Sequence, residues 1–565
     1  MMARPLWKRL ALLCGALMGL GFAFPAQAQL DIFENNNQEP PGRRGFTFGP
    51  IKLNKQAGSR EMARGNTFYA DKNYAAASLM FYRVVKDAAG SRYFQAAQFQ
   101  LALSLYRMGL FHAALDYFTD IIRAGANHRY FKRALTYSIT VSRKLQNESM
   151  FLGKLRSFNV SDFPNQYRDE LLYLLGKYYY LREDLSLEKR LPLAQRLLNR
   201  VRSQKPEYYA RAQYILGAIY DTSDRAELAG KSAQAFKRAA RAAMRIQDKE
   251  MRQRVFELGI MGIARIHYSA KHFGGSTYWY QAIPRNSPRW LDALFEMSWA
   301  FLRRGKYEET LGIIHTLRSP YFKNEYYPEV GILQAVSFFE RCRYTEVKKI
   351  VQDYLTQYRP LVASLNSFLQ RNPNDEAMYK ALSELRNQQE EKTKVAGLED
   401  DPSEQMFQRI LNLTFRDKPL QVLFSYIKEL EGELAIIQQS SQAWQQSAIG
   451  LEMAKRLREE RVKKIKEAGA RARERILKAQ TELQGLIGQA LKIQYETLSA
   501  QKERINKAAN ESGGFTMRVK GQENKDRKLI SVSVADDFTF WPFQNEYWID
   551  ELGYYRYRIK GECHR

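Results

Sequence analysis

Residues 264–283 read ARIHYSAKHFGGSTYWYQAI, and residues 298–317 read SWAFLRRGKYEETLGIIHTL. The two stretches begin 34 positions apart and share a pattern of side-chain sizes. A small residue is followed by a large one three positions later and by an aromatic six further on. Small, large and apolar residues then follow at steps of three, four and three. This spacing predicts a pair of antiparallel helices that repeats along the chain.

The pattern has a physical reason. Two antiparallel helices approach closely where a small side chain of one faces a large side chain of the other, and the aromatic near the turn closes the open end of the pair. This is the tetratricopeptide pattern. Each pair leaves one apolar face uncovered, so pairs must stack on one another. We therefore predict a mostly α-helical protein with a tetratricopeptide-like α-solenoid.

The pattern returns with varying quality between residues 58 and 360, and we count about seven units, five good and two poor. Between Tyr130 and Phe163 helices are expected, but the pattern is blurred. An irregular bundle of amphipathic helices is the alternative. The other units are marked by Gly65, Phe68, Tyr74, Ala77 and Phe81; by Ala102, Leu105, Phe111, Ala114 and Phe118; by Gly176, Tyr179, Ala194 and Leu198; by Gly217, Tyr220, Ser232, Phe236 and Ala239; and by Ala335, Phe338, Tyr344 and Val351.

Residues 1–28 have the three parts of a secretory signal peptide. Basic residues precede an apolar run at 10–24, and a small-x-small cleavage site ends at Ala28. We expect cleavage after Ala28 and a periplasmic protein. The apolar run is shorter than the ~20 residues that span a bilayer, and no other segment is long and apolar enough to do so. Residues 29–57 are polar and predict a flexible leader.

The chain of 565 residues carries 88 Lys and Arg against 61 Asp and Glu, a formal net charge of +27. In an exported protein this charge does not point to nucleic acid. The anionic partners there are lipid head groups, cell-wall polymers and acidic proteins. A basic but merely solvated surface is the alternative.

Two cysteines, Cys342 and Cys563, remain after removal of the signal peptide. An oxidising compartment permits a bridge between them. They lie 221 residues apart in regions of different character, and Cys342 falls in an expected inter-helix turn. The sequence leaves their pairing open.

The pattern ends at Pro360. Residues 361–402 predict a helical connector, broken at residues 372–374, followed by a charged linker. Residues 403–510 carry a narrow apolar stripe, which predicts a long helical hairpin or coiled coil. Its partner is either the preceding segment, residues 407–449, or a second chain. Residues 451–510 hold 15 Lys and Arg against 8 Glu, which is either a solvated face or a contact with an anionic surface.

The last segment, residues 511–565, differs again. Alternating apolar residues at 515–519 and 529–534 predict a β-hairpin. The ring-rich stretch at 538–557 follows. Its rings form either a small core docked on the helical hairpin, which we expect, or a binding surface. Trp541 and Trp548 are the candidate binding residues of this tail.

The tail reads WPFQNEYWIDELGYYRYR at residues 541–558. The order of signal peptide, repeat array, long basic helical segment and this tail resembles periplasmic tetratricopeptide-repeat proteins of myxobacteria and their relatives. Some of those are associated with the adventurous gliding motility machinery. The resemblance implies a role in a cell-envelope assembly, with motility as one such role.

No pattern of a catalytic or metal site is present. The six histidines include no pair at the i, i+4 spacing of a zinc helix, and two cysteines cannot build a Cys-rich metal site. Gly274-Gly275-Ser276 lacks the Lys-Ser/Thr of a phosphate loop, and no Gly-x-Ser-x-Gly elbow occurs. We expect no enzyme, no cofactor and no metal.

The sequence therefore favours an exported, non-catalytic scaffold that binds protein partners of the cell envelope. The candidate groove residues, expected on the inner helix of each pair, are Arg107, Tyr179, Arg265 and Arg303. The alternative is a module that binds anionic cell-wall polymer or lipid head groups through the basic helical segment at 451–510.

Overall fold

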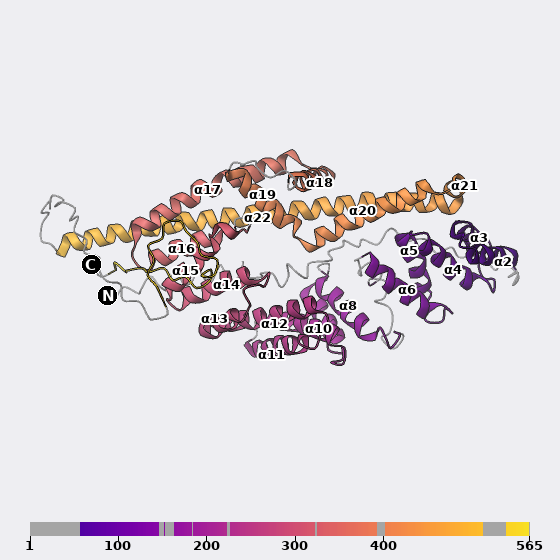
Figure 1. The fold of residues 1–565 in the computed structure, drawn as a ribbon, viewed down its shortest axis with the longest axis horizontal. Helices are drawn as coiled ribbons and strands as arrows, with labels where there is room; N and C mark the ends of the chain where they lie inside the picture. Colours follow the sequence, from indigo (N-terminus) through magenta and orange to yellow (C-terminus); the bar gives the residue numbers. More distant parts are fainter. Residues whose placement is uncertain are drawn as a thin grey trace. The chain divides into compact units, whose positions relative to one another are not determined.

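The computed structural model describes residues 57–145, 152, 163–182, 185–222, 226–322, 325–392, 402–511 and 538–563. These residues form twenty α-helices and one short 3-10 helix, and they include no β-strand (Figure 1). Among them, no helix combines the length and the hydropathy that a membrane span requires. The chain divides into two compact units. The first comprises residues 1–266, 367–400 and 410–477, and the second comprises residues 267–366, 401–409 and 478–565.

The predicted helix hairpins are confirmed. Each first helix ends in a short turn, and the next helix returns along it. The pairs are α2 (Ser59–Ala70) with α3 (Tyr74–Asp87), α4 (Phe94–Arg107) with α5 (Phe111–Arg123), α8 (Arg168–Leu181) with α9 (Leu187–Leu198), α10 (Pro206–Asp221) with α11 (Ala226–Ala243), α12 (Lys249–Ser269) with α13 (Phe273–Gln281), α14 (Trp290–Arg303) with α15 (Tyr307–Leu317), and α16 (Glu329–Phe339) with α17 (Tyr344–Arg371). The helix α6 (Phe131–Lys144) follows α5.

Small residues do face large ones inside these pairs. A Cβ on Gly65 would lie 2.6 Å from the ring of Phe81, and one on Gly217 would lie 2.7 Å from the ring of Phe236. In the α12–α13 pair the order is reversed, because the glycine, Gly275, belongs to the second helix. A Cβ on Gly275 would lie 2.7 Å from Nδ1 of His267 in the first helix. The side-chain size pattern of the sequence is therefore the pattern of helix contact.

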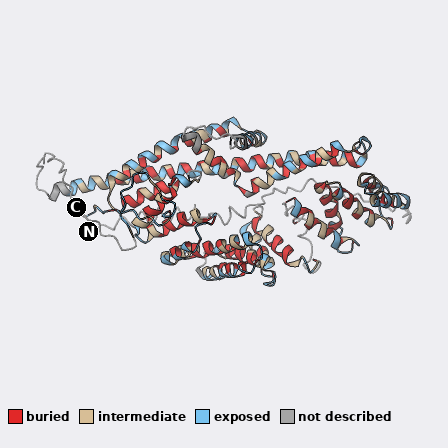
Figure 2. Ribbon diagram, in the orientation of Figure 1, coloured by how far each residue is buried: buried red, intermediate tan, exposed pale blue. Residues whose placement is uncertain are grey.

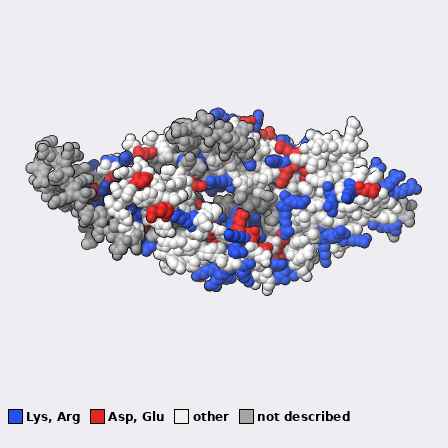
Figure 3. All heavy atoms as spheres, viewed as in Figure 1, with Lys and Arg blue, Asp and Glu red and all other residues white. Residues whose placement is uncertain are grey.

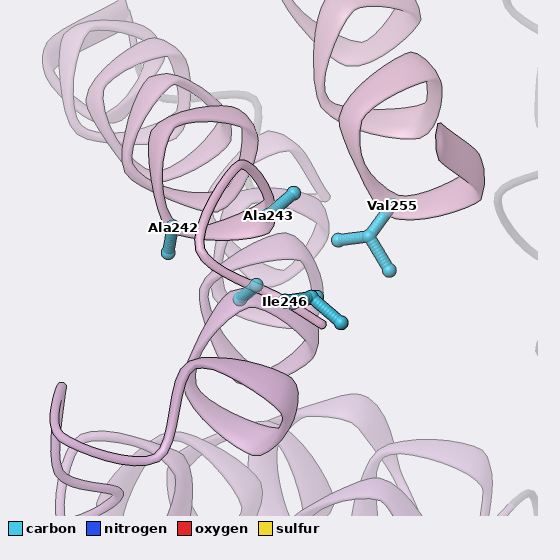
Figure 4. Close-up of a cluster of buried hydrophobic side chains, with 5 residues drawn as sticks. Ala242, Ala243, Ile246 and Val255 are labelled. Atoms are coloured by element: carbon cyan, nitrogen blue, oxygen red, sulfur yellow. The ribbon is translucent and has the colours of Figure 1, made fainter. Parts of the chain in front are cut away.

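Neighbouring pairs share a continuous apolar core in the first unit. Ala242 and Ala243 of α11, Ile246 of the following turn and Val255 of α12 are buried against Ala210 of α10 (Figure 4). Figure 2 shows buried residues on the facing sides of these helices and exposed residues on the other sides. Small alanines at this junction let three helices approach one another.

The predicted helical hairpin is present in the first unit, and its partner is the preceding segment. Helix α20 (Lys418–Gln439) turns through α21 (Gln442–Gln445) into α22 (Ala448–Glu511) (Figure 1). Glu431 pairs with Arg461, Tyr426 with Lys464 and Asp417 with Arg471, so the partner number rises as the first number falls. The two helices are therefore antiparallel.

Helix α18 (Asp375–Lys392) packs on this hairpin. Its first residue, Asp375, binds Arg473 at 3.4 Å, and a Cβ on Gly469 would lie 1.8 Å from the Asp375 carbonyl oxygen. The predicted break at residues 372–374 is confirmed, because α17 ends at Arg371 and α18 begins at Asp375. Pro360, where the sequence analysis ends the solenoid, lies inside α17 instead. The end of the solenoid expected at this residue stays a prediction, because a boundary of the repeat array need not coincide with the end of a helix.

The tip of the hairpin packs on the first helix pairs, a contact that the sequence analysis did not predict. Trp444 is 1 % exposed and donates its indole N–H to Ser78 Oγ at 3.0 Å. The Tyr82 hydroxyl donates to Glu452 at 2.5 Å. His112 of α5 binds Glu433 of α20 through its backbone N–H and through Nδ1, both at 2.7 Å. Beside them, burial raises the pKa of Glu429 to about 7.

The second unit contains the helices α13 to α16, most of α17, the 3-10 helix η2 (Pro320–Phe322), the beginning of α19 (Pro402–Phe415), the end of α22 and the tail. One side of α22 is buried in this unit. The buried positions are Leu483, Leu486, Ala490, Ile493 and Thr497, which continue the stripe predicted from the sequence.

The tail differs from the prediction. The β-hairpin expected at residues 515–534 lies outside the described residues, and residues 538–563 contain turns without a strand. The rings of this segment do not dock on the helical hairpin. They lie on α14, α15 and α16, where a disulfide and backbone hydrogen bonds hold the segment, so its core is supplied by the solenoid. The predicted signal peptide and most of the leader lie outside the described residues and stay predictions, as do the domain boundaries.

Candidate functional site

A cavity of 720 Å³ lies in the second unit, where the last helix pair meets the segment that follows α15. Its wall contains residues 317–320, residues of α16 and α17, Met406 and Arg409 of α19, and Tyr557 of the tail. Gly331 of α16 leaves room for the ring of Tyr354 in this wall. A Cβ at that position would lie 2.5 Å from the ring of Tyr354, so a larger residue would displace this ring.

Three basic side chains line the cavity: Arg318, Lys349 and Arg409. In the described part of the chain none of them forms an ion pair, and the Arg409 guanidinium lies 4.0 Å from the Met406 sulfur. The wall also contains three acidic residues, Glu325, Glu346 and Asp353. Glu346 is paired with Arg343, and Asp353 acts electrostatically on Arg318. Lys349 and Arg409 are therefore the cations of the wall that are most available to an anionic group.

Tyrosine hydroxyls add hydrogen-bonding groups. Tyr354 and Tyr358 are 4 % and 8 % exposed, with ring centroids 4.4 Å apart. Burial raises the pKa of Tyr358 to about 12, so its hydroxyl stays protonated and can donate. The Tyr326 and Tyr354 hydroxyls and Gln334 Oε1 are buried without a hydrogen-bond partner among the described residues. Each such group costs about 1–3 kcal/mol, which a bound polar ligand would recover.

The tail is tied to the same region by a disulfide between Cys342, in the turn after α16, and Cys563. Arg341 binds this end of the tail twice: its guanidinium donates to the Ile559 carbonyl at 3.3 Å, and its carbonyl accepts from the Glu562 N–H at 2.9 Å. The Tyr557 N–H donates to the Glu308 carbonyl of α15 at 3.0 Å. These bonds place Tyr557 in the wall of the cavity.

The tail also encloses His315 of α15. The imidazole stacks on the ring of Tyr547 at a centroid distance of 4.5 Å, and it meets the edges of Phe543 and Tyr555 at 4.6 and 4.8 Å. Burial lowers the pKa of His315. An imidazole packed against three aromatic rings anchors the segment that supplies them, so His315 holds the tail on α15.

Other rings of the tail face solvent. Trp541 and Trp548 are 52 % and 40 % exposed, their centroids lie 4.6 Å apart, and the Trp541 indole N–H donates to Glu546. The rings of the tail are thus partly buried and partly exposed, and a binding role for the two tryptophans stays a prediction. Leu552 and Ile559 are buried, whereas the two tryptophans remain accessible.

The four candidate groove residues lie on four different helices. Arg107 ends α4 and is exposed beside Tyr69, and Tyr179 and Arg265 are partly buried in α8 and α12. The Arg303 guanidinium of α14 lies 5.3 Å from the centre of the Phe273 ring of α13, in the preceding helix pair. None of the four lines the cavity, so their role in binding stays a prediction.

The cavity residues Arg318, Lys349 and Arg409 were missed for a clear reason. The repeat pattern marks only the small and large residues that pack between helices, whereas these cations lie outside that pattern. Arg409 also comes from α19, beyond the repeats. The sequence could have indicated one feature of the cavity: Tyr354 and Tyr358 are four positions apart on one helix, so their side chains lie on the same face.

Much of the basic charge of α22 is engaged within the molecule. Arg471 and Arg475 both bind Asp417, Arg473 binds Asp375, and Lys464 binds Glu467. Figure 3 shows Lys and Arg side chains spread over the face in view, with Asp and Glu side chains among them. Part of the predicted solvated face thus forms ion pairs: those of Asp417 join α22 to the start of α20, that of Asp375 joins α22 to α18, and that of Glu467 lies within α22.

The described residues contain no group of three or more His, Cys, Asp or Glu side chains arranged to hold a metal ion. The expectation that the protein is not an enzyme and needs no cofactor stays a prediction, because a site of unfamiliar type is not tested by this observation.

No protein-family model and no curated protein matches the chain. Among solved structures, the crystal structure of yeast Tom70 is similar to this chain at 10 % sequence identity and a TM-score of 0.20, with coverage of 72 % of this chain and 96 % of that chain. A likeness of this strength adds nothing to the helix pairs described above. Those pairs make the chain a mostly α-helical protein with a tetratricopeptide-like solenoid.

Proposed function

We propose that this protein is a non-catalytic scaffold that holds an acidic segment of a partner protein in the cavity of its second unit. The observation that carries the proposal is that Arg318, Lys349 and Arg409 form no salt bridge among the described residues and lie beside tyrosine hydroxyls without a hydrogen-bond partner there. Cations bind carboxylates in charge-assisted hydrogen bonds, which are stronger than neutral ones. Stacked helix pairs supply a rigid frame for such a contact.

We also propose that the scaffold works in the periplasm, as part of a cell-envelope assembly. The signal-peptide pattern at residues 1–28 and the disulfide between Cys342 and Cys563 support this location, because disulfides persist in oxidising compartments. The resemblance of the tail at 541–558 to periplasmic repeat proteins favours an envelope assembly, and the gliding machinery is one candidate.

Peptide binding by the purified full chain tests the cavity. A fluorescent oligoglutamate peptide should bind saturably, and an oligoglutamine peptide of the same length should not. Combining Arg318→Glu with Arg409→Glu should weaken oligoglutamate binding by about a hundredfold, since each lost charged contact is worth roughly 1.5 kcal/mol.

Lys249→Glu with Arg254→Glu is the matched control, because both side chains are exposed on α12 and the change in net charge is the same. This variant should bind as the wild type does. An equal loss in both variants would mean that the peptide responds only to net charge, and the cavity would not be its site.

The alternative function, binding of anionic polymer or lipid through α22, receives less support. The basic residues that pair with Asp417, Asp375 and Glu467 are already used within the hairpin. Their ion pairs would have to break, or other cations would have to carry the contact. We therefore do not base the proposal on this helix.

A further inference from the structure

The end of α22 carries a second apolar stripe, about a third of the way round the helix from the buried one. Leu491, Tyr495, Leu498 and Ile505 are 40 %, 71 %, 50 % and 67 % exposed. Their neighbours Ala490, Ile493 and Thr497 are buried on a different side of the same helix. No described residue covers the exposed side, although large apolar residues gathered on one surface usually mark a contact.

The spacing of this stripe is seven residues. Gln484, Leu491, Leu498 and Ile505 follow one another at that interval, and Tyr495 lies four positions after Leu491. On a straight helix of 3.6 residues per turn such a stripe drifts round the surface. It stays in line only when two helices wind around each other, so this period indicates a helical partner. From Gln484 to Ile505 the stripe is about 30 Å long.

We propose that this stripe joins two copies of the chain in a parallel, in-register coiled coil. The polar residue of the stripe decides between orientations. In register, Gln484 lies opposite Gln484 of the second copy, and the two amides can hydrogen-bond. In the antiparallel arrangement Gln484 would lie opposite Ile505, which would bury an amide without a partner at a cost of about 1–3 kcal/mol.

The flanking residues fit the same arrangement. In a parallel coiled coil the residue after one stripe position faces the residue before a stripe position of the other helix. Lys492 then faces Ile487, and Ser499 faces Gln494, so these flanks oppose no like charges. Lys502 is the one charged stripe position, and its long side chain can carry the ammonium group out to water.

The helix is already formed, so association does not have to order it first. The contact is nevertheless short, with three leucine or isoleucine layers and one tyrosine layer. It lies at the small end of specific interfaces. We therefore expect a dimer that dissociates on dilution. The contact does not involve the cavity, so it is independent of the proposed peptide binding.

Sedimentation velocity of the full chain over a range of concentrations tests the proposal. The wild type should shift from monomer to dimer as concentration rises. Leu491→Glu with Leu498→Glu should stay monomeric with unchanged helical circular dichroism. The control, Leu187→Glu with Met244→Glu, replaces two equally exposed apolar side chains elsewhere and should dimerise as the wild type does. A wild type that is monomeric throughout, or a stripe variant that still dimerises, would overturn the proposal.

Cross-linking tests the orientation, because both native cysteines outside the signal peptide are bridged to each other. Under mild oxidation, Ile505→Cys should give a disulfide-linked dimer in the parallel arrangement, where the two copies of residue 505 meet. An equimolar mixture of the single variants Gln484→Cys and Ile505→Cys should then give mainly like-with-like dimers. Predominance of the mixed dimer would show antiparallel helices and would reject the register.

Discussion

Glu329 shows how burial can outweigh two favourable effects on one carboxyl group. It lies in the first turn of α16, where backbone N–H groups and the helix dipole favour the ionised form. Burial nevertheless raises the pKa of Glu329 to about 7, with Glu482 adding in the same direction. The ionised carboxylate is therefore a source of instability in the folded protein above neutral pH.

Glu329→Gln tests this balance. The carboxyl group has a higher pKa folded than unfolded, so folding takes up a proton between about pH 4.5 and 7 and the wild type gains stability as pH falls through that window. The variant should be more stable than the wild type by about 2 kcal/mol near pH 8, allowing for partial exposure, and about equal near pH 5. Urea unfolding at both pH values measures this.

Glu346→Gln is the control for the sign, because the Arg343 guanidinium lowers the pKa of Glu346. Its wild-type carboxylate stabilises the fold above about pH 4.5, and this stability is lost as pH falls. Glu346→Gln should therefore lose stability near pH 8. If both variants changed stability in the same direction at that pH, the assignment for Glu329 would be wrong.

At the scale of elements, the tail docks on α15 because one helical residue has no side chain. A Cβ on Gly312 would lie 1.7 Å from the Tyr555 carbonyl oxygen, a backbone atom that cannot rotate away. Nearby, the Gly553 N–H donates to Thr316 Oγ1 at 2.9 Å. The helix surface thus accepts an extended backbone directly.

Gly312→Ala should separate the tail from α15. Alanine favours the helix itself by about 1 kcal/mol, so helix propensity alone predicts a more stable protein. At the contact with the tail, however, the clash of the new methyl group with the Tyr555 carbonyl oxygen should outweigh this gain. Hydrogen exchange of the Gly553 and Tyr557 amides should accelerate by at least about tenfold, while the disulfide keeps the end of the tail attached. Gly485→Ala, at a position where a Cβ meets nothing within 4 Å, should leave both amides protected. Unchanged protection in Gly312→Ala would refute the docking.

The same elements show what a sequence can predict. The helix pairs were predictable because Gly65 and Phe81, or Gly217 and Phe236, lie within one hairpin, where a fixed spacing carries the contact. The position of the tail could not be predicted in this way. Arg285 donates a hydrogen bond to the Asp550 carbonyl across 265 residues, and no local pattern links the two. The cavity was missed for the same reason. Its cations come from separate elements that only the fold brings together.

At the scale of the molecule, each compact unit is assembled from distant segments of chain. In the first unit Trp444 and Ser78 are bonded across 366 residues, and His112 and Glu433 across 321. The first helix pairs thus complete their core only when the hairpin has been made. Such long-range closure predicts slow, cooperative formation of this unit.

Trp444→Ala tests whether the two units are separate in stability. The side chain is 1 % exposed, so its removal should cost the first unit about 3–5 kcal/mol. Hydrogen exchange should accelerate in α3, α20 and the start of α22, whereas α14 to α16 of the second unit should keep their protection. Trp541→Ala, which truncates a half-exposed tryptophan of the second unit, should leave α3 unchanged. Equal loss of protection in both units after Trp444→Ala would mean that the units unfold together through helices that both share, such as α22. The division into two units would then describe packing but not stability.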